Sequence, residues 1–120
     1  MRLVGIIDGM GAMEHETNSS LFHLIINHQI EAGFGAVRAH GSRGAFAMRL
    51  LVEKESLRVL DCAELVQSSQ DIVIAAPSSF APQKGFSRLC SSDLAEKSAI
   101  FNPKTGKGST DRLYLVGEEE

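Results

Sequence analysis

The chain has 120 residues, a hydrophobic share of 43%, a charged share of 22% and a formal net charge of −3 at pH 7. These values are typical of a single globular domain over residues 1–120 with a core of its own. A weakly acidic chain without a long basic run argues against nucleic acid as the main partner, because phosphate contacts need clustered Lys and Arg.

The first third of the chain predicts a strand, a loop and a helix. Residues 3–7 form a short β-branched apolar run, which indicates a buried strand. Residues 9–20 follow as a polar loop with two glycines. Residues 21–32 carry apolar side chains at helical spacing, with His23 in a polar stripe and Ser19 or Ser20 as N-cap. These patterns predict a helix there.

The remainder is expected to continue this alternation. The expected strands are residues 36–39, 57–60, 71–77 and 113–116; the expected helices are residues 63–68 and 93–99; polar loops separate them. Residues 45–53 suit either a helix or a strand, and the choice stays open. Alternating strands and helices predict an α/β fold, a Rossmann-like three-layer sandwich with a mostly parallel central sheet and helices on both faces.

In such a sheet, ligands bind beyond the carboxyl ends of the strands. The first loop there begins Asp8-Gly9-Met10-Gly11, and its glycines would let the backbone approach a ligand closely. The following helix N-terminus would attract an anion. The dinucleotide fingerprint is incomplete, because Glu14 stands where its third glycine belongs. A tight turn with no ligand is an equally weighted alternative for these glycines.

Acid–base or metal chemistry is a second prediction for this loop. Asp8, His15 and Glu16 are expected to lie near one another at the strand end, where they could move a proton or hold a divalent metal. The zinc-protease signature is absent, because Ser19 replaces its second histidine. Whether a metal or another cofactor is bound stays open, and an ordinary solvated loop is the alternative.

A second polar turn holds His40, Ser42 and Arg43 between glycines. Arg43 could form two hydrogen bonds to a carboxylate or phosphate, and His40 could act as a base near neutral pH. The predicted catalytic residues are therefore Asp8, His15, Glu16 and His40. The predicted ligand-binding residues are Gly9, Gly11, Ser19, Ser20, Ser42, Arg43, Ser78 and Ser79.

Two functions fit these clusters. One is the binding of a small anionic metabolite, with acid–base or metal-assisted hydrolysis or group transfer. The other is a non-catalytic ligand-binding or regulatory module that forms a homo-oligomer. Residues 102–110 lack the first glycine of a phosphate loop, yet they form a basic loop that could close over an anion.

The cysteines and the N-terminus bear on the compartment. Cys62 and Cys90 are far apart in a chain with an adequate core, so buried, inert free thiols are expected rather than a disulfide. The apolar run before Asp8 is too short for a signal peptide, and no stretch reaches the roughly 18 apolar residues of a membrane helix. These features predict a cytoplasmic protein without a membrane partner.

Overall fold

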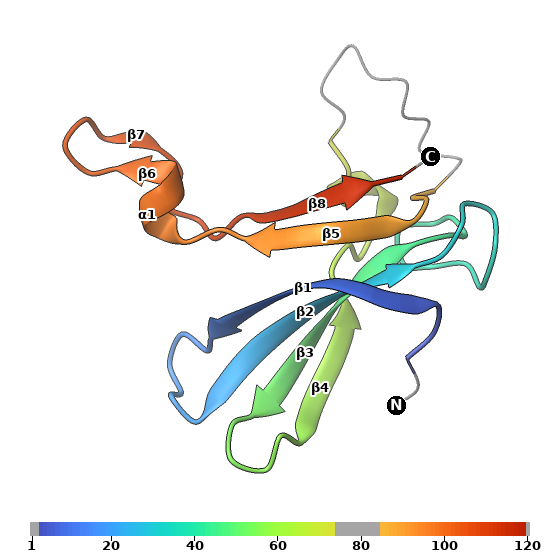
Figure 1. Ribbon diagram of the computed structural model, residues 1–120, viewed down its shortest axis with the longest axis horizontal. Helices are drawn as coiled ribbons and strands as arrows, with labels where there is room; N and C mark the ends of the chain where they lie inside the picture. The colour runs from blue at the N-terminus through green and yellow to red at the C-terminus, as the bar shows by residue number, and fades with distance from the viewer. Residues whose placement is uncertain (1–2, 74–84, 120) are drawn as a thin grey trace.

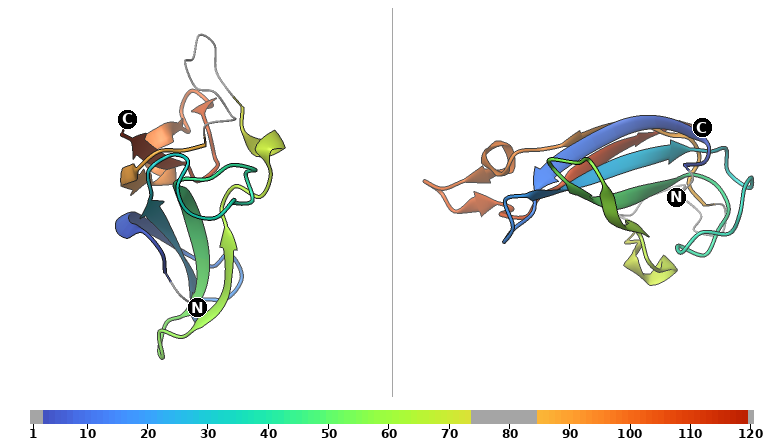
Figure 2. Two further views of the ribbon diagram at one scale, coloured as in Figure 1. Left: turned by 90° about the vertical axis from the view of Figure 1, so that its right-hand side faces the viewer. Right: turned by 90° about the horizontal axis from the view of Figure 1, so that it is seen from below.

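The computed structural model describes residues 3–73 and 85–119, and antiparallel β-strands dominate it (Figure 1). The predicted parallel α/β sandwich is therefore wrong. Every strand pair of the described residues is antiparallel, and their one α-helix is a single turn, α1 (Lys97–Ile100). Within residues 3–73 and 85–119, no layer of helices covers either face of a sheet (Figures 1 and 2).

The main sheet is a meander in which each strand pairs with the next along the chain. Its strands are β1 (Ile6–Glu14), β2 (Leu21–Gln29), β3 (Phe46–Glu53) and β4 (Val59–Glu64), in the order β1-β2-β3-β4. A short 3₁₀-helix, η1 (Ser69–Asp71), follows β4. Strands β1 and β4 form the two edges of this sheet.

The C-terminal part adds a second layer and a projecting hairpin. Strand β5 (Leu89–Leu94) pairs with β8 (Tyr114–Glu118) in a two-stranded sheet. Between them, α1 leads into a small hairpin of β6 (Phe101–Asn102) and β7 (Lys107–Gly108). Figure 1 shows this hairpin extending away from both sheets.

Strand β2 is buried on both faces, and this explains why its sequence resembles a helix. Ile26 lies in the hydrophobic core with Leu50 and Val52 of β3. The adjacent residue Asn27 points to the other face, as neighbours in a strand do, and donates to the Cys90 carbonyl of β5. Because both faces need apolar or satisfied side chains, the polar–apolar alternation of a half-exposed strand is missing. The predicted helix over residues 21–32 is wrong for this reason.

The glycines of the expected first loop belong to strand β1. A Cβ atom on Gly9 would lie 2.4 Å from Ser92 Oγ and 2.5 Å from the Cys90 oxygen, and a Cβ on Gly11 would lie 2.6 Å from Leu94 Cβ. Strand β5 thus packs directly on the backbone of β1, which requires residues without side chains. The glycine pattern reflects this close packing of two strands.

Other predicted elements are confirmed or wrong for local reasons. Residues 45–53 take the strand alternative as β3, and the strand over 113–116 is confirmed as β8. The expected strand 36–39 lies in an irregular connection between β2 and β3. The helices expected over 63–68 and 93–99 are replaced by the end of β4, the end of β5 and the single turn α1. In the strand expected over 71–77, Asp71 ends η1, and residues 74–77 lie outside the described residues.

Candidate functional site

A groove of about 780 Å³ lies at the end of the β1–β2 hairpin. It brings together His15 and Glu16 from the hairpin, Arg49 from β3, and Lys97 and Arg112 from the two ends of the segment that carries α1, β6 and β7. His23 of β2 completes its wall. The groove therefore combines side chains from four separate parts of the chain.

Two imidazoles that line this groove stack on each other. The ring centroids of His15 and His23 are 5.3 Å apart, and the ring planes differ by 28°. His23 pairs with Met13 across the β1–β2 ladder, and the turn residue Thr17 donates its N–H to His15 Nδ1 at 3.3 Å. The hairpin register and its turn thus fix the two rings against each other.

The surroundings of His23 disfavour its charged form. Burial lowers the pKa of His23 below its ordinary value of 6.5, and the positive charge of Arg49 and the proximity of His15 lower it further. Its Nδ1 atom is buried and has no hydrogen-bond partner among the described residues. His23 is therefore a neutral imidazole at pH 7, able to accept a proton.

Two of the groove's carboxylates are already paired with basic groups. Glu14 Oε1 lies 2.9 Å from Lys54 Nζ, and this contact lowers the pKa of Glu14. Glu96 Oε2 lies 3.1 Å from Arg112 Nη1, while Arg112 Nη2 donates to the Leu94 carbonyl. Within the described ranges, Arg49 and Lys97 make no ion pair. The groove thus holds two cations without a carboxylate partner, beside the single unpaired carboxylate of Glu16.

The residues expected in the first loop separate into three places. His15 and Glu16 line the groove. Asp8 is an exposed residue within β1 and lines none of the cavities found among the described residues. Gly9 and Gly11 face β5, so the space above their backbone is filled by protein.

The two serines expected to cap a helix lie in the β1–β2 turn instead. Ser20 donates its backbone N–H to Asn18 Oδ1 at 3.0 Å, and its hydroxyl lies 2.6 Å from the same oxygen. Ser19 is exposed in the same turn. The helix N-terminus that was to attract an anion does not exist, because the segment continues as β2.

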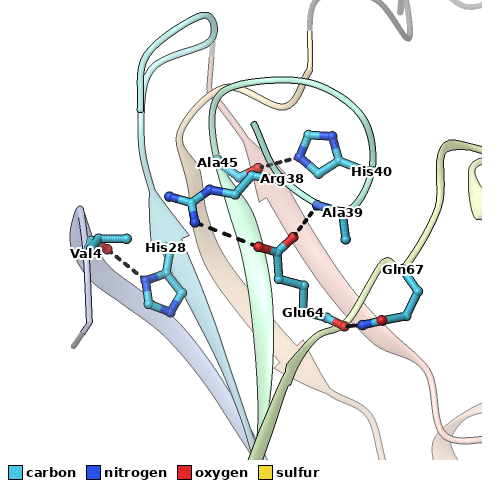
Figure 3. Close-up of polar contacts among 8 residues, drawn as sticks. All are labelled: Val4, His28, Arg38, Ala39, His40, Ala45, Glu64 and Gln67. Atoms are coloured by element: carbon cyan, nitrogen blue, oxygen red, sulfur yellow. Dashed lines mark hydrogen bonds and ion pairs between the residues drawn. The ribbon is translucent and has the colours of Figure 1, made fainter. Parts of the chain in front are cut away.

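His40 lies apart from the groove, in the long connection between β2 and β3 (Figure 3). It is 2% exposed, its Nε2 lies 3.3 Å from the Ala45 carbonyl oxygen, and its ring meets the Phe86 ring edge-on at 5.2 Å. It lines a smaller, mostly apolar cavity of about 290 Å³ with Tyr114. His40 and the His15–His23 pair therefore do not share a cavity.

The neighbours of His40 hold this connection in place. Arg43 is exposed and donates to the Gly35 carbonyl. Glu64 accepts the Ala39 N–H at 2.7 Å and lies 3.7 Å from Arg38, as Figure 3 shows. Ser42 is half-buried in the same connection. Ser78 and Ser79 lie outside the described residues.

Four residues of the groove were not predicted as site residues from the sequence: His23, Arg49, Lys97 and Arg112. His23 was assigned to the polar face of a helix, and the other three came from elements with no expected link to the first loop. The basic segment over 102–110 was the one available signal, since Lys97 and Arg112 flank it. Among residues 3–73 and 85–119, no cluster of three or more His, Cys, Asp or Glu side chains could hold a metal ion.

Cys62 and Cys90 are both free, as expected, but neither is fully buried: Cys62 is exposed and Cys90 is half-buried. No helix in the described ranges is long and apolar enough to cross a membrane. No protein-family model, no curated protein and no solved structure matches this chain. The groove's own chemistry is therefore the basis for a functional proposal.

Proposed function

We propose that the protein binds a small anionic metabolite in the groove at the end of the β1–β2 hairpin. The observation that carries this proposal is the guanidinium of Arg49, which lies beside the stacked His15–His23 pair and has no carboxylate partner among the described residues. An arginine in this setting offers planar, two-pronged hydrogen bonding to a phosphate or carboxylate.

The charges around Arg49 favour an anion of more than one negative charge. Lys97 adds an ammonium group that has no ion-pair partner among the described residues, and Arg112 adds a guanidinium held in place by Glu96 and the Leu94 carbonyl. The chain as a whole carries a net charge of −3. Three cations and three carboxylates line the groove, but Glu14 is paired with Lys54 and Glu96 with Arg112. Arg49 and Lys97 therefore keep their charge for an anionic ligand.

Hydrolysis or group transfer is the catalytic form of this proposal. His23 supports it, because its lowered pKa provides a neutral base at pH 7, and Glu16 is a carboxylate in the same groove. Asp8 and His40 do not line the groove and have no role in this catalytic proposal. The non-catalytic alternative is a regulatory module that binds the same anion through Arg49 and Lys97 without turnover.

The test is isothermal titration calorimetry with inorganic phosphate and pyrophosphate. We expect measurable binding that the Arg49→Gln variant weakens by about tenfold or more, the range for a lost charged hydrogen bond. The control is Arg58→Gln, which removes an exposed arginine from the β3–β4 turn outside the groove. Equal binding by the two variants and the native protein, or no binding at all, would contradict the proposal.

We further propose that the protein works in the cytoplasm. Two free thiols in one chain support this, because an oxidising compartment favours disulfides. Fractionation of cells that express the tagged chain tests this location directly.

A further inference from the structure

Residues 97–112, here called the basic arm, differ in charge from the rest of the chain. The arm carries four basic residues and one acidic residue, a net charge of +3, which leaves −6 for the rest of a chain with a total of −3. Its basic residues are Lys97, Lys104, Lys107 and Arg112. This segment thus has a net positive charge within an acidic chain.

The basic arm makes few contacts with the rest of the fold. Strands β6 and β7 pair through two residues each, and the arm extends away from both sheets (Figure 1). Asn102 holds the turn, since its Oδ1 accepts the Lys104 N–H at 2.9 Å. Isolated two-stranded hairpins are only marginally stable in water. A projecting hairpin with exposed Lys104 and Lys107 is therefore suited to contact something outside the chain.

The basic arm and the groove form one continuous surface. Lys97 and Arg112, the two ends of the arm, also line the groove beside Arg49. The ammonium groups of Lys104 and Lys107 make no ion pair with the described residues. A small anion in the groove would reach Arg49, Arg112 and Lys97 but would leave the two lysines of the hairpin unused. A longer polyanion would engage all five.

We infer that the groove and the basic arm together bind single-stranded nucleic acid, an inference that rests on the proposed anion-binding function. A strand carries many phosphates, and the groove offers Arg49, Lys97 and Arg112 to them while the arm adds Lys104 and Lys107. The His15–His23 pair adds two aromatic rings to the groove wall, and nucleic-acid bases stack on aromatic side chains. An acidic peptide would have no use for this pair, so the rings favour nucleic acid.

The composition of the chain argues against nucleic acid as a partner, whereas the arrangement of the basic residues in the folded chain favours it. The basic residues are spread over β3, α1, the hairpin turn, β7 and the segment before β8, so no basic run exists in the sequence. Folding brings Arg49, Lys97 and Arg112 together in the groove, and the hairpin with Lys104 and Lys107 projects from there (Figure 1). The net negative charge resides on the remainder of the chain.

The experiment measures fluorescence anisotropy of a labelled thymidine oligonucleotide of about 12 nucleotides, a length within the range of one binding domain. The test variant is Lys104→Gln/Lys107→Gln, and the control is Arg58→Gln. We expect the double variant to weaken oligonucleotide binding and to reduce the slope of log K against log[salt] by about 1.4, or about 0.7 for each lost phosphate contact. Calorimetric binding of pyrophosphate should not change.

The outcomes separate the two proposals. If pyrophosphate binds but the oligonucleotide does not, or if the double variant binds it as the native protein does, the inference fails and the anion site stands. If a polyglutamate peptide binds more tightly than the oligonucleotide, the assignment to nucleic acid is overturned. If neither pyrophosphate nor oligonucleotide binds, both proposals fail. Thermal unfolding of each variant checks that the sheets are intact.

Discussion

The hydroxyl of Tyr114 lies 3.0 Å from Asn27 Oδ1, and this contact joins the last strand, β8, to the centre of the main sheet. Ser92 Oγ lies 2.8 Å from the same hydroxyl, and Asn27 Nδ2 donates to the Cys90 carbonyl at 2.8 Å. Burial raises the pKa of Tyr114, so its proton remains available to donate. Asn27 is fully buried, and these bonds satisfy both ends of its amide.

Loss of the Tyr114 hydroxyl should destabilise the protein. The Tyr114→Phe variant leaves Asn27 Oδ1 buried without its donor, and we expect the free energy of unfolding to fall by about 1–3 kcal/mol. Urea denaturation measures this change. Combining Tyr114→Phe with Asn27→Ala should cost less than the sum of the two single changes, because both remove the same bond. Strict additivity would show that the two side chains do not interact.

Substitution of the β1 glycines should disturb the contact between the two sheets. A methyl group at Gly9 or Gly11 would overlap backbone or side-chain atoms of β5, so Gly11→Ala should destabilise by about 1–3 kcal/mol. Gly117→Ala in β8 is the matched control, since its nearest neighbour is the Ser91 side chain at 3.1 Å. If the two variants unfold at the same urea concentration, β5 does not pack on β1 as described.

Stability should decrease as the pH falls through the titration range of His23. Its pKa in the folded protein lies below the ordinary value of 6.5, so the unfolded chain binds the proton more tightly. The free energy of unfolding should therefore drop below about pH 6.5, and His23→Gln should reduce this drop. Urea denaturation between about pH 7.5 and pH 5 measures both curves.

Binding of an anion in the groove should raise the pKa of His23. An anion in the groove offsets the charge of Arg49, so phosphate should raise the pKa of His23 in an NMR titration. The Arg49→Gln variant should raise the same pKa without phosphate and leave a smaller response to it. A His23 pKa that phosphate leaves unchanged would place the anion elsewhere.

The two thiols should react at different rates. Cys62 is exposed, whereas partial burial and the carboxylate of Glu119 raise the pKa of Cys90. A disulfide reagent at pH 7–8 should therefore modify one thiol quickly, and Cys62→Ser should remove that fast phase. Cys90→Ser serves as the control and should keep it.

Some of the fold could be predicted from sequence, and the limits have physical causes. Local patterns identified the strand at residues 113–116 and kept a strand open for 45–53. They failed for β2, because burial on both faces removes the alternation that marks a strand. Because β2 was predicted to be a helix, the predicted strands and helices alternated along the chain, and that alternation predicted a parallel sheet.

Only part of the candidate site could likewise be predicted from the sequence. His15 and Glu16 were predicted from the sequence, since the turn that carries them is polar and lies between two apolar runs. Arg49 and Arg112 were not, because their place beside His23 depends on strand pairing and on contacts between distant segments. Gly9 and Gly11 were recognised as unusual, but the partner that requires them is β5, some 80 residues further along the chain.

The β5–β1 contact also determines the order in which the molecule can be completed during synthesis. The meander ends at Glu64, so its four strands can pair by short-range hairpin closure before β5 leaves the ribosome. Tyr114, whose hydroxyl lies 3.3 Å from the Gly9 carbonyl oxygen, arrives 105 residues after its partner. Until β5 has been synthesised, the backbone of β1 at Gly9 and Gly11 has no cover. The nascent chain therefore passes through a stage in which an open strand face is exposed to chaperones and to other chains.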